Sequence, residues 1–213
     1  MRLFSYIMVC VVLLLPATAR GQFDPVFLNS LGVQYMLGDG VPQNSEEAFH
    51  LFEQAAEQGY TLAENNLANC YYNGEGVKKD QKKALYWYER AAKKGNPTAQ
   101  CSVGECYYFG NGVSRDLERA VYWFQKAADQ NYAYAQFRLG LCYNKGHGVM
   151  RDTKRCIYWL EKSARQGFPK AQYEFGNCYA NGFGVAKDME KARYWWQRAA
   201  NQGFDRAEEA LRK

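Results

Sequence analysis

The residues of this 213-residue chain that could do chemistry are few and widely spaced. Only two histidines are present, His50 and His147, so neither an imidazole-rich metal site nor most histidine-dependent catalysis is expected. The chain contains no Gly-x-Ser-x-Gly, Ser-x-x-Lys, His-Glu-x-x-His or Cys-x-x-Cys pattern, which are spacings typical of hydrolases, zinc peptidases and dithiol sites. We therefore expect no enzyme activity, no metal and no cofactor.

A glycine-rich pattern is the remaining candidate for a chemical site. Gly74-Glu75-Gly76-Val77 is similar to part of a phosphate-binding loop, but such a loop needs a preceding strand and a lysine in register. That context is missing here, and Gly-x-Gly-Val occurs five times along the chain. Five equivalent copies indicate a repeated structural loop rather than a ligand site.

The chain as a whole follows a period of 36 residues. Positions 12 and 14 of the repeat are glycine in every copy, and position 33 is glycine except in the third copy, where it is Asn131. Asn is the usual substitute for Gly in the left-handed backbone conformation, so position 33 is predicted to end a helix. The predicted organisation is a signal peptide (1–19), a short lead (20–26), five repeats (27–62, 63–98, 99–134, 135–170 and 171–206) and a partial capping helix (207–213).

Each repeat is predicted to contain two amphipathic helices. In the second copy, Ala63, Leu67 and Tyr71 follow helical spacing before the glycines, and Asp80 can cap a second helix after them. One helical pair cannot bury both of its faces, so neighbouring pairs must stack. The predicted fold class is therefore all-α: a right-handed α-α superhelix, or solenoid, of five helix-loop-helix repeats after a signal peptide.

The first 19 residues are predicted to be a secretory signal peptide. Arg2 supplies a positive charge, an apolar run ends at Leu15, and Ala17-Thr18-Ala19 is a small-x-small cleavage pattern. An uncleaved anchor is the alternative, but the run is short for a spanning helix. The mature chain from Arg20 is expected to be periplasmic or secreted, with the endoplasmic reticulum lumen as the alternative, and without a membrane span.

The repeated residues resemble a known family. The pattern Ala-x-x-x-Leu-Gly-x-x-Tyr-x-x-Gly-x-Gly-Val-x-x-Asp, followed by an aligned Ala and Trp and by Ala-Ala-x-x-Gly, is similar to the Sel-one-like repeat, a relative of the tetratricopeptide repeat. The resemblance covers all five copies, and the first departs most, with Phe27 for Ala, Asn44 for Asp and Leu51 for Trp. It implies a non-enzymatic α-solenoid adaptor that binds a protein or peptide partner.

By analogy with tetratricopeptide repeats, positions 3, 7, 10 and 11 of the first helices are predicted to line a concave groove. Asn recurs at these positions although it is a poor helix former. Our hypothesis is that the amides bind an extended peptide backbone while the aromatic rings supply contact area. The predicted partner-binding residues are Asn65, Asn69, Tyr72, Asn73, Tyr108, Phe109, Phe137, Tyr173, Asn177 and Asn181.

Other functions have less support in the sequence. Glycan or small-ligand binding in the tyrosine-rich groove is the alternative, and a β-lactamase-like hydrolase is disfavoured because Ser-x-x-Lys is missing. The 27 Lys and Arg are interleaved with 22 Asp and Glu, so nucleic acid is not an expected partner. The aligned tryptophans are expected to pack within or between repeats; they are Trp87, Trp123, Trp159 and Trp195.

Six cysteines follow the predicted signal peptide. Cys70, Cys106, Cys142 and Cys178 share one repeat position, and equivalent points on successive repeats lie too far apart for a disulfide. Cys156 replaces a small alanine at the start of a second helix, from where it could reach Cys142 or Cys178. Both pairings stay open, beside the alternative that every cysteine is a small buried residue.

Overall fold

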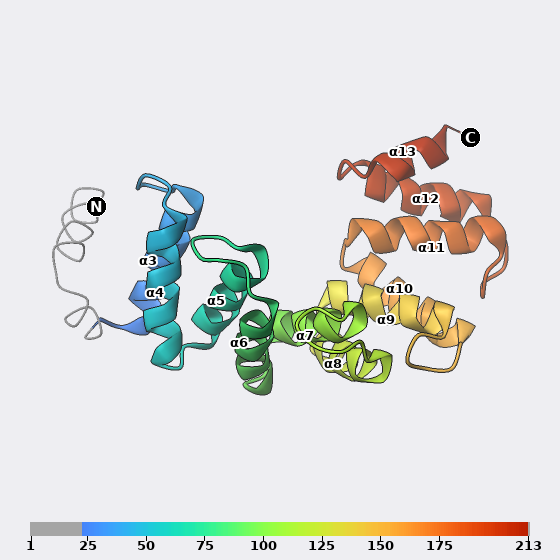
Figure 1. Ribbon diagram of the computed structural model, residues 1–213. Helices are drawn as coiled ribbons and strands as arrows, with labels where there is room; N and C mark the ends of the chain where they lie inside the picture. The colour runs from blue at the N-terminus through green and yellow to red at the C-terminus, as the bar shows by residue number, and fades with distance from the viewer. Residues whose placement is uncertain (1–22, 213) are drawn as a thin grey trace. The chain divides into compact units, whose positions relative to one another are not determined.

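The computed structural model describes residues 23–212, so the predicted signal peptide lies outside the described residues. This part of the chain is all α, with eleven helices and no strand (Figure 1). The helices are α3 (Pro25–Leu37), α4 (Ser45–Glu57), α5 (Thr61–Asn73), α6 (Gln81–Lys93), α7 (Pro97–Phe109), α8 (Leu117–Asp129), α9 (Ala133–Lys145), α10 (Thr153–Arg165), α11 (Pro169–Asn181), α12 (Met189–Ala200) and α13 (Asp205–Leu211).

Side-chain caps fix the start of every second helix. The Asp80 carboxylate accepts hydrogen bonds from the backbone N–H groups of Lys82 and Lys83, both at 3.0 Å, and Asn44 caps α4 in the same way. Such a cap satisfies donors that have no partner inside the helix. At the other end of the hairpin, Asn131 has a φ of +65°, the left-handed conformation expected where Asn replaces Gly.

The two helices of a hairpin meet where position 26 packs on position 6. A β carbon at Gly104 would lie 2.6 Å from the Phe124 ring, and one at Gly176 would lie 2.6 Å from the Trp196 ring. Phe124 is fully buried and Trp196 is nearly so. Glycine at position 6 therefore admits a large ring from the second helix.

The described residues form two compact units, which we describe separately. The first ends at Lys94 and contains α3 to α6, and the second begins at Gly95 and contains α7 to α13. Within each unit, every helix packs against the helix that precedes it in the chain. The hairpins of a unit therefore lie side by side in sequence order, as the repeat pattern predicts.

Neighbouring repeats approach each other at the loop glycines. A β carbon at Gly76 would lie 1.9 Å from the carbonyl oxygen of Ser45, at the start of α4. Gly148 lies equally close to Leu117, at the start of α8, where the corresponding distance would be 2.1 Å. No side chain fits in either place, so these glycines allow one repeat to stack on the next.

An amide pair of one exposed and one buried glutamine recurs inside the last three repeats. It joins position 32, after the second helix, to position 2, on the first helix of the same repeat. The pairs are Gln130–Gln100 at 2.7 Å, Gln166–Gln136 at 2.7 Å and Gln202–Gln172 at 2.9 Å, with the first-named amide donating.

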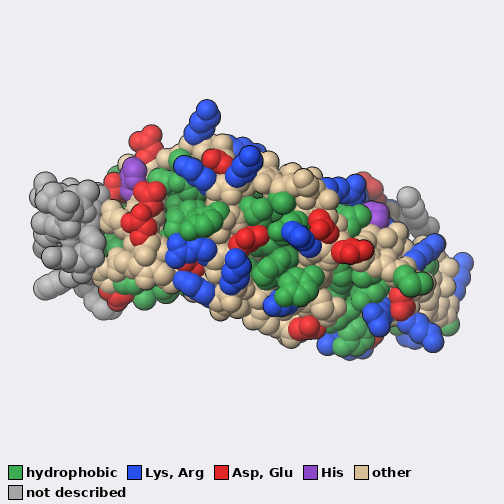
Figure 2. All heavy atoms as spheres, turned by 60° about the horizontal axis from the view of Figure 1, so that its bottom comes forward, with side chains coloured by type: hydrophobic (Ala, Val, Ile, Leu, Met, Phe, Trp, Pro, Cys, Tyr) green, Lys and Arg blue, Asp and Glu red, His purple; other side chains and the backbone are tan. Residues whose placement is uncertain are grey.

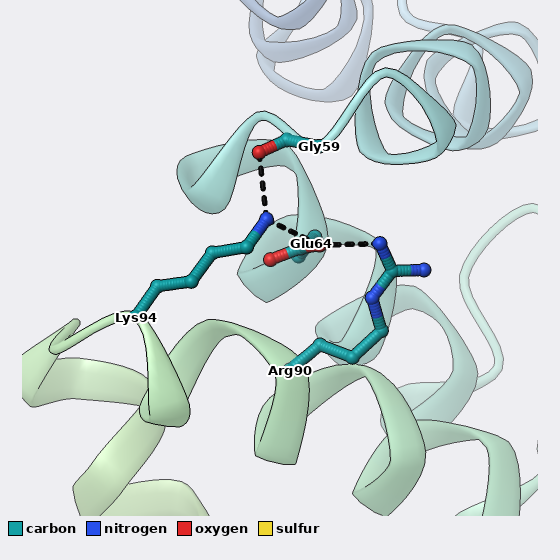
Figure 3. Close-up of polar contacts among 4 residues, drawn as sticks. All are labelled: Gly59, Glu64, Arg90 and Lys94. Carbon is teal, nitrogen blue, oxygen red and sulfur yellow. Dashed lines mark hydrogen bonds and ion pairs between the residues drawn. The ribbon is translucent and has the colours of Figure 1, made fainter.

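The second repeat replaces this amide pair with an ion pair (Figure 3). The carboxylate of Glu64 has no exposed surface. Its Oε1 lies 2.9 Å from Lys94 Nζ and 3.0 Å from the Arg90 guanidinium, and Lys94 Nζ also donates to the carbonyl of Gly59 at 2.7 Å. Among the second to fifth repeats, only the second makes this connection with charged groups.

Candidate functional site

The predicted partner-binding residues lie on the first helices, but not all of them are accessible. Phe109 is 58% exposed, and Asn73 and Asn181 are also exposed. Asn65 and Phe137 are buried, with 9% and 8% of their surface exposed. The other five are half-buried: Asn69, Tyr72, Tyr108, Tyr173 and Asn177. Asn65 is therefore a poor candidate for contact with a ligand.

In the first unit, a crevice of about 210 Å³ opens between α3 and α5. We call it the N-terminal crevice. Its floor is formed by the apolar side chains of Val33, Met36, Leu37 and Phe52. Its polar lining consists of Asn66, Asn69, Cys70 and Glu75.

In the second unit, a crevice of about 240 Å³ is lined from α9, α10 and α11, and we call it the C-terminal crevice. Its apolar side chains are Leu141, Leu160 and Phe183. Its polar lining consists of Asn144, Glu174, Asn177, Cys178 and Asn181. Seven of its eight lining residues stand three periods of 36 residues after a lining residue of the N-terminal crevice, as Asn177 does after Asn69. The two crevices are therefore the same site of the repeat, with different side chains.

The amides of Asn69 and Asn177 are held by buried rings on the second helices. Tyr88 donates its hydroxyl to Asn69 Oδ1 at 2.5 Å, and Trp196 donates its indole N–H to Asn177 Oδ1 at 3.2 Å. An indole N–H can only donate, so the amide oxygen must face the ring. The Nδ2 group of Asn69 is left for a ligand carbonyl, whereas that of Asn177 already donates to Glu174 Oε2 at 3.4 Å.

This contact explains where asparagine occurs at position 7. Asn is found where position 26 is a ring with a donor, Tyr88 or Trp196. Where position 26 is Phe52 or Leu160, position 7 is apolar. The asparagines thus have a structural role that the sequence analysis missed, although the covariation is visible in the aligned repeats.

The sequence analysis also missed Arg138, which lies in the corresponding place between α7 and α9. Its side chain is only 9% exposed and forms an ion pair with Glu105. Its guanidinium lies 4.8 Å from the ring centroid of Tyr108 and 4.9 Å from that of Phe124. His147, from the next loop, shares a 2.7 Å hydrogen bond with the Tyr108 hydroxyl. Tyr108 and Phe109 therefore belong to a filled crevice.

Two wider cavities adjoin the C-terminal crevice. One of about 360 Å³ is lined by Tyr173, Asn177 and Asn181 together with Arg193 and Trp196. The other, of about 560 Å³, includes Phe137 and Glu174 in its lining. The structure thus brings the predicted residues of α9 and α11 to a common surface of the second unit.

The aligned tryptophans pack as expected rather than forming an open platform. Trp159 and Trp195 are each only 7% exposed, and Trp87 and Trp123 are half-buried. In each case the preceding tyrosine is exposed and a Lys or Arg one turn later lies over the rings, as Lys162 does 5.3 Å from Trp159. These residues stabilise the second helices.

All six described cysteines are free and buried, so neither pairing of Cys156, with Cys142 or with Cys178, is formed in the structure. Burial raises the pKa of Cys70 and Cys178 from 9.0 to about 12, and that of Cys142 and Cys156 to about 11. A thiol with such a pKa is not ionised at neutral pH and is a poor nucleophile. The thiols therefore act as small core residues.

We expect native protein to resist iodoacetamide at pH 8, whereas urea should expose all six thiols. Unfolded thiols ionise at lower pH than the buried ones, so the free energy of unfolding should fall as pH rises from 9.0 towards about 12. Mass spectrometry after alkylation measures the first result, and urea titrations at several pH values measure the second. Rapid alkylation of Cys70 in the native protein would instead show that the reagent enters the N-terminal crevice and reaches the Cys70 thiol in its lining.

Between residues 23 and 212, no group of three or more His, Cys, Asp or Glu side chains is placed to hold a metal ion. In the same part of the chain, no helix has the length and apolar character needed to span a membrane.

Comparison with known proteins identifies the repeat. The Sel1 repeat matches residues 26–60, 61–96, 97–132, 133–168 and 169–204, so each matched segment begins one or two residues before our predicted frame. No curated protein matches the chain.

Solved structures agree with this match. The chain is 35% identical to c5321, a protective antigen of uropathogenic Escherichia coli with an SLR fold, over 88% of this chain and 40% of that one, with a TM-score of 0.81. It is 35% identical to a Sel1 repeat protein of Oxalobacter formigenes, over 86% and 75% of the two chains, with a TM-score of 0.83. The fold also resembles Helicobacter pylori cysteine rich protein B at 23% identity, with 63% and 97% covered and a TM-score of 0.51. The five matched repeats and these two relatives show that the chain belongs to the Sel1 repeat family.

Proposed function

We propose that this chain is an exported scaffold that binds a peptide or protein partner along its first helices. Sel1 repeat proteins typically act as protein–protein interaction scaffolds. The chain spans only 40% of the c5321 structure, so the role of that antigen is not transferred to it. The export part of the proposal rests on the pattern of residues 1–19.

The observation that carries the binding part is the pair of equivalent crevices. Each lies between neighbouring first helices, is open to solvent, and combines an apolar floor with an amide held in one orientation. An extended peptide can match both features, because its side chains, which can contact the apolar floor, alternate with backbone carbonyl groups, which can accept from the amide. A fixed amide also loses little conformational entropy when it binds.

The test must remove the amide without damaging the core. Asn69→Val alone leaves the buried Tyr88 hydroxyl without its acceptor, which should lower the free energy of unfolding by about 1 to 3 kcal/mol. Adding Tyr88→Phe should restore most of that loss, because Val33 and Phe52 already form this apolar pair in the first repeat. Urea denaturation of the two variants measures both effects.

The double variant is then the probe for function. We expect Asn69→Val/Tyr88→Phe, in the chain that begins at Arg20, to lose capture of a native partner while it keeps its melting temperature. Capture would be measured by affinity pull-down with mass spectrometry, and thermal shifts with glycans would test the alternative ligand. Undiminished capture by the stable double variant would exclude this crevice from partner binding.

A further inference from the structure

One crevice of this protein is already filled by a side chain of the same chain, that of Arg138. Arg138 fills the space between α7 and α9, where its guanidinium is paired with Glu105 and donates a hydrogen bond to the Tyr134 hydroxyl at 3.1 Å. The rings of Phe124 and Tyr108 lie within 5 Å of it, close enough for cation–π attraction. This arrangement shows which chemistry the repeat site accommodates: a guanidinium on a ring, beside a carboxylate.

The N-terminal crevice has the same ring on its floor but lacks both the arginine and its paired carboxylate, since Val33 stands two periods before Glu105. Phe52 stands two periods before Phe124, and Asn66 stands two periods before Arg138. Because Asn66 is shorter than arginine, the space above Phe52 stays open, with a volume of about 210 Å³. Glu75 lines the opening and forms no ion pair within the described residues; its side chain accepts one hydrogen bond, from the Asn73 amide at 3.1 Å.

The chain that leads to this crevice is acidic. From Phe23 to Val77, Asp and Glu are the only charged residues; Lys78 and Lys79 follow in the same loop as Glu75, with Lys79 Nζ 5.6 Å from the centroid of the Tyr72 ring. Figure 2 shows this in part: red side chains gather near the residues drawn in grey, whereas blue ones are spread over the rest of that face. A negative field of this kind attracts a cationic partner and repels an anionic one.

We propose that the N-terminal crevice binds an arginine side chain of a basic partner peptide. The aliphatic part of that arginine lies on Val33, Met36 and Leu37, its guanidinium stacks on Phe52, and its charge is met by Glu75. The guanidinium lies on its ring as Arg138 lies on Phe124, but its carboxylate partner comes from the loop after α5 instead of from a first helix. This inference rests on the proposed function and names the chemistry of the partner.

The C-terminal crevice is not included in the proposal. It also contains a carboxylate, Glu174, but Leu160 replaces the ring on its floor. The adjoining cavities are lined by Lys170, Arg193 and Arg206, which oppose a cationic ligand. Among the crevices described here, only the N-terminal crevice therefore combines an open space with both a carboxylate and an aromatic ring.

The experiment measures binding of acetylated, amidated peptides in which glycine alternates with arginine, lysine or glutamine. Fluorescence anisotropy with the chain from Arg20 at low salt gives the dissociation constants. We expect the arginine peptide to bind more tightly than the lysine peptide, because only guanidinium stacks well on a ring, and the glutamine peptide to bind least. Glu75→Gln should weaken binding of the arginine peptide by about threefold.

Two further variants make the test specific. Glu57→Gln removes an equally exposed carboxylate at the far end of α4 and should leave binding of the arginine peptide unchanged. Val33→Glu/Asn66→Arg copies Glu105 and Arg138 into the first unit, and should fill the crevice and weaken binding at least about tenfold. Circular dichroism confirms that each variant is folded.

Equal weakening by Glu75→Gln and Glu57→Gln would mean that the peptide senses only the general charge, and would overturn the proposal. Undiminished binding to a folded Val33→Glu/Asn66→Arg variant would do the same. If the arginine peptide does not bind while the wild-type chain still captures its native partner, the arginine pocket is wrong and the scaffold function stands. If the chain binds neither the arginine peptide nor its native partner, both the arginine pocket and the scaffold function are rejected.

Discussion

Replacing Gly76 with alanine is expected to destabilise the first unit by at least about 3 kcal/mol. Two costs combine at this position. Its φ of +69° is strained for any residue with a side chain, and the added β carbon would lie 1.9 Å from the Ser45 carbonyl oxygen. Because that oxygen belongs to the backbone, no rotation of a side chain can relieve the clash.

Gly40 provides a matched control for this prediction. It is the same repeat position in the first copy and has nearly the same φ, +74°, but nothing lies within 4 Å of a β carbon added there. Gly40→Ala should therefore cost only the backbone strain, about 1 kcal/mol. Urea denaturation followed by circular dichroism gives both values. Equal losses in the two variants would show that stacking at Gly76 does not require the close backbone contact.

The second large effect is expected at the buried ion pair of Glu64. Lys94→Gln leaves the buried carboxylate with Arg90 as its sole cationic partner and should lower the free energy of unfolding by about 2 kcal/mol. Glu64→Gln alone should cost less, about 0.5 to 1 kcal/mol, because the Lys94 ammonium can turn to water and still bond the Gly59 carbonyl.

The double variant Glu64→Gln/Lys94→Gln should recover most of the loss. It recreates the amide pair that Gln100 and Gln130 form in the next repeat, so no buried charge remains. Unfolding free energies of the four proteins form a double-mutant cycle that isolates the coupling between the two side chains. A double variant as unstable as Lys94→Gln would mean that the amide pair needs features that the second repeat lacks.

The sequence was sufficient to predict the fold because the repeat is fixed by backbone geometry. Glycine, asparagine and aspartate at set positions determine where each helix begins and ends; Asp80 and Asn131 act as predicted, and Asn44 caps α4 in place of Asp. Five copies of one pattern also average out local ambiguity, so helix identity does not depend on any single segment.

The candidate site could be predicted only in part, because its residues occupy positions that the repeat leaves variable. Asn69 and Asn177 were recognised as unusual, but their bonds to Tyr88 and Trp196 connect two helices of a hairpin and require the packed structure. Arg138 was missed because a single cation in one copy looks like a surface residue. Its burial depends on Glu105 in the preceding repeat, which no periodicity reveals.

The pairing of position 7 with position 26 has a consequence for how such a protein diversifies. Because the amide and its ring change together and both belong to one hairpin, an exchange of the two side chains alters a single recognition unit and leaves its neighbours intact. A library that varies these pairs independently in each copy would change which residues of a partner each copy binds. Selection would then act on these variable pairs, while the glycine contacts between repeats stay unchanged.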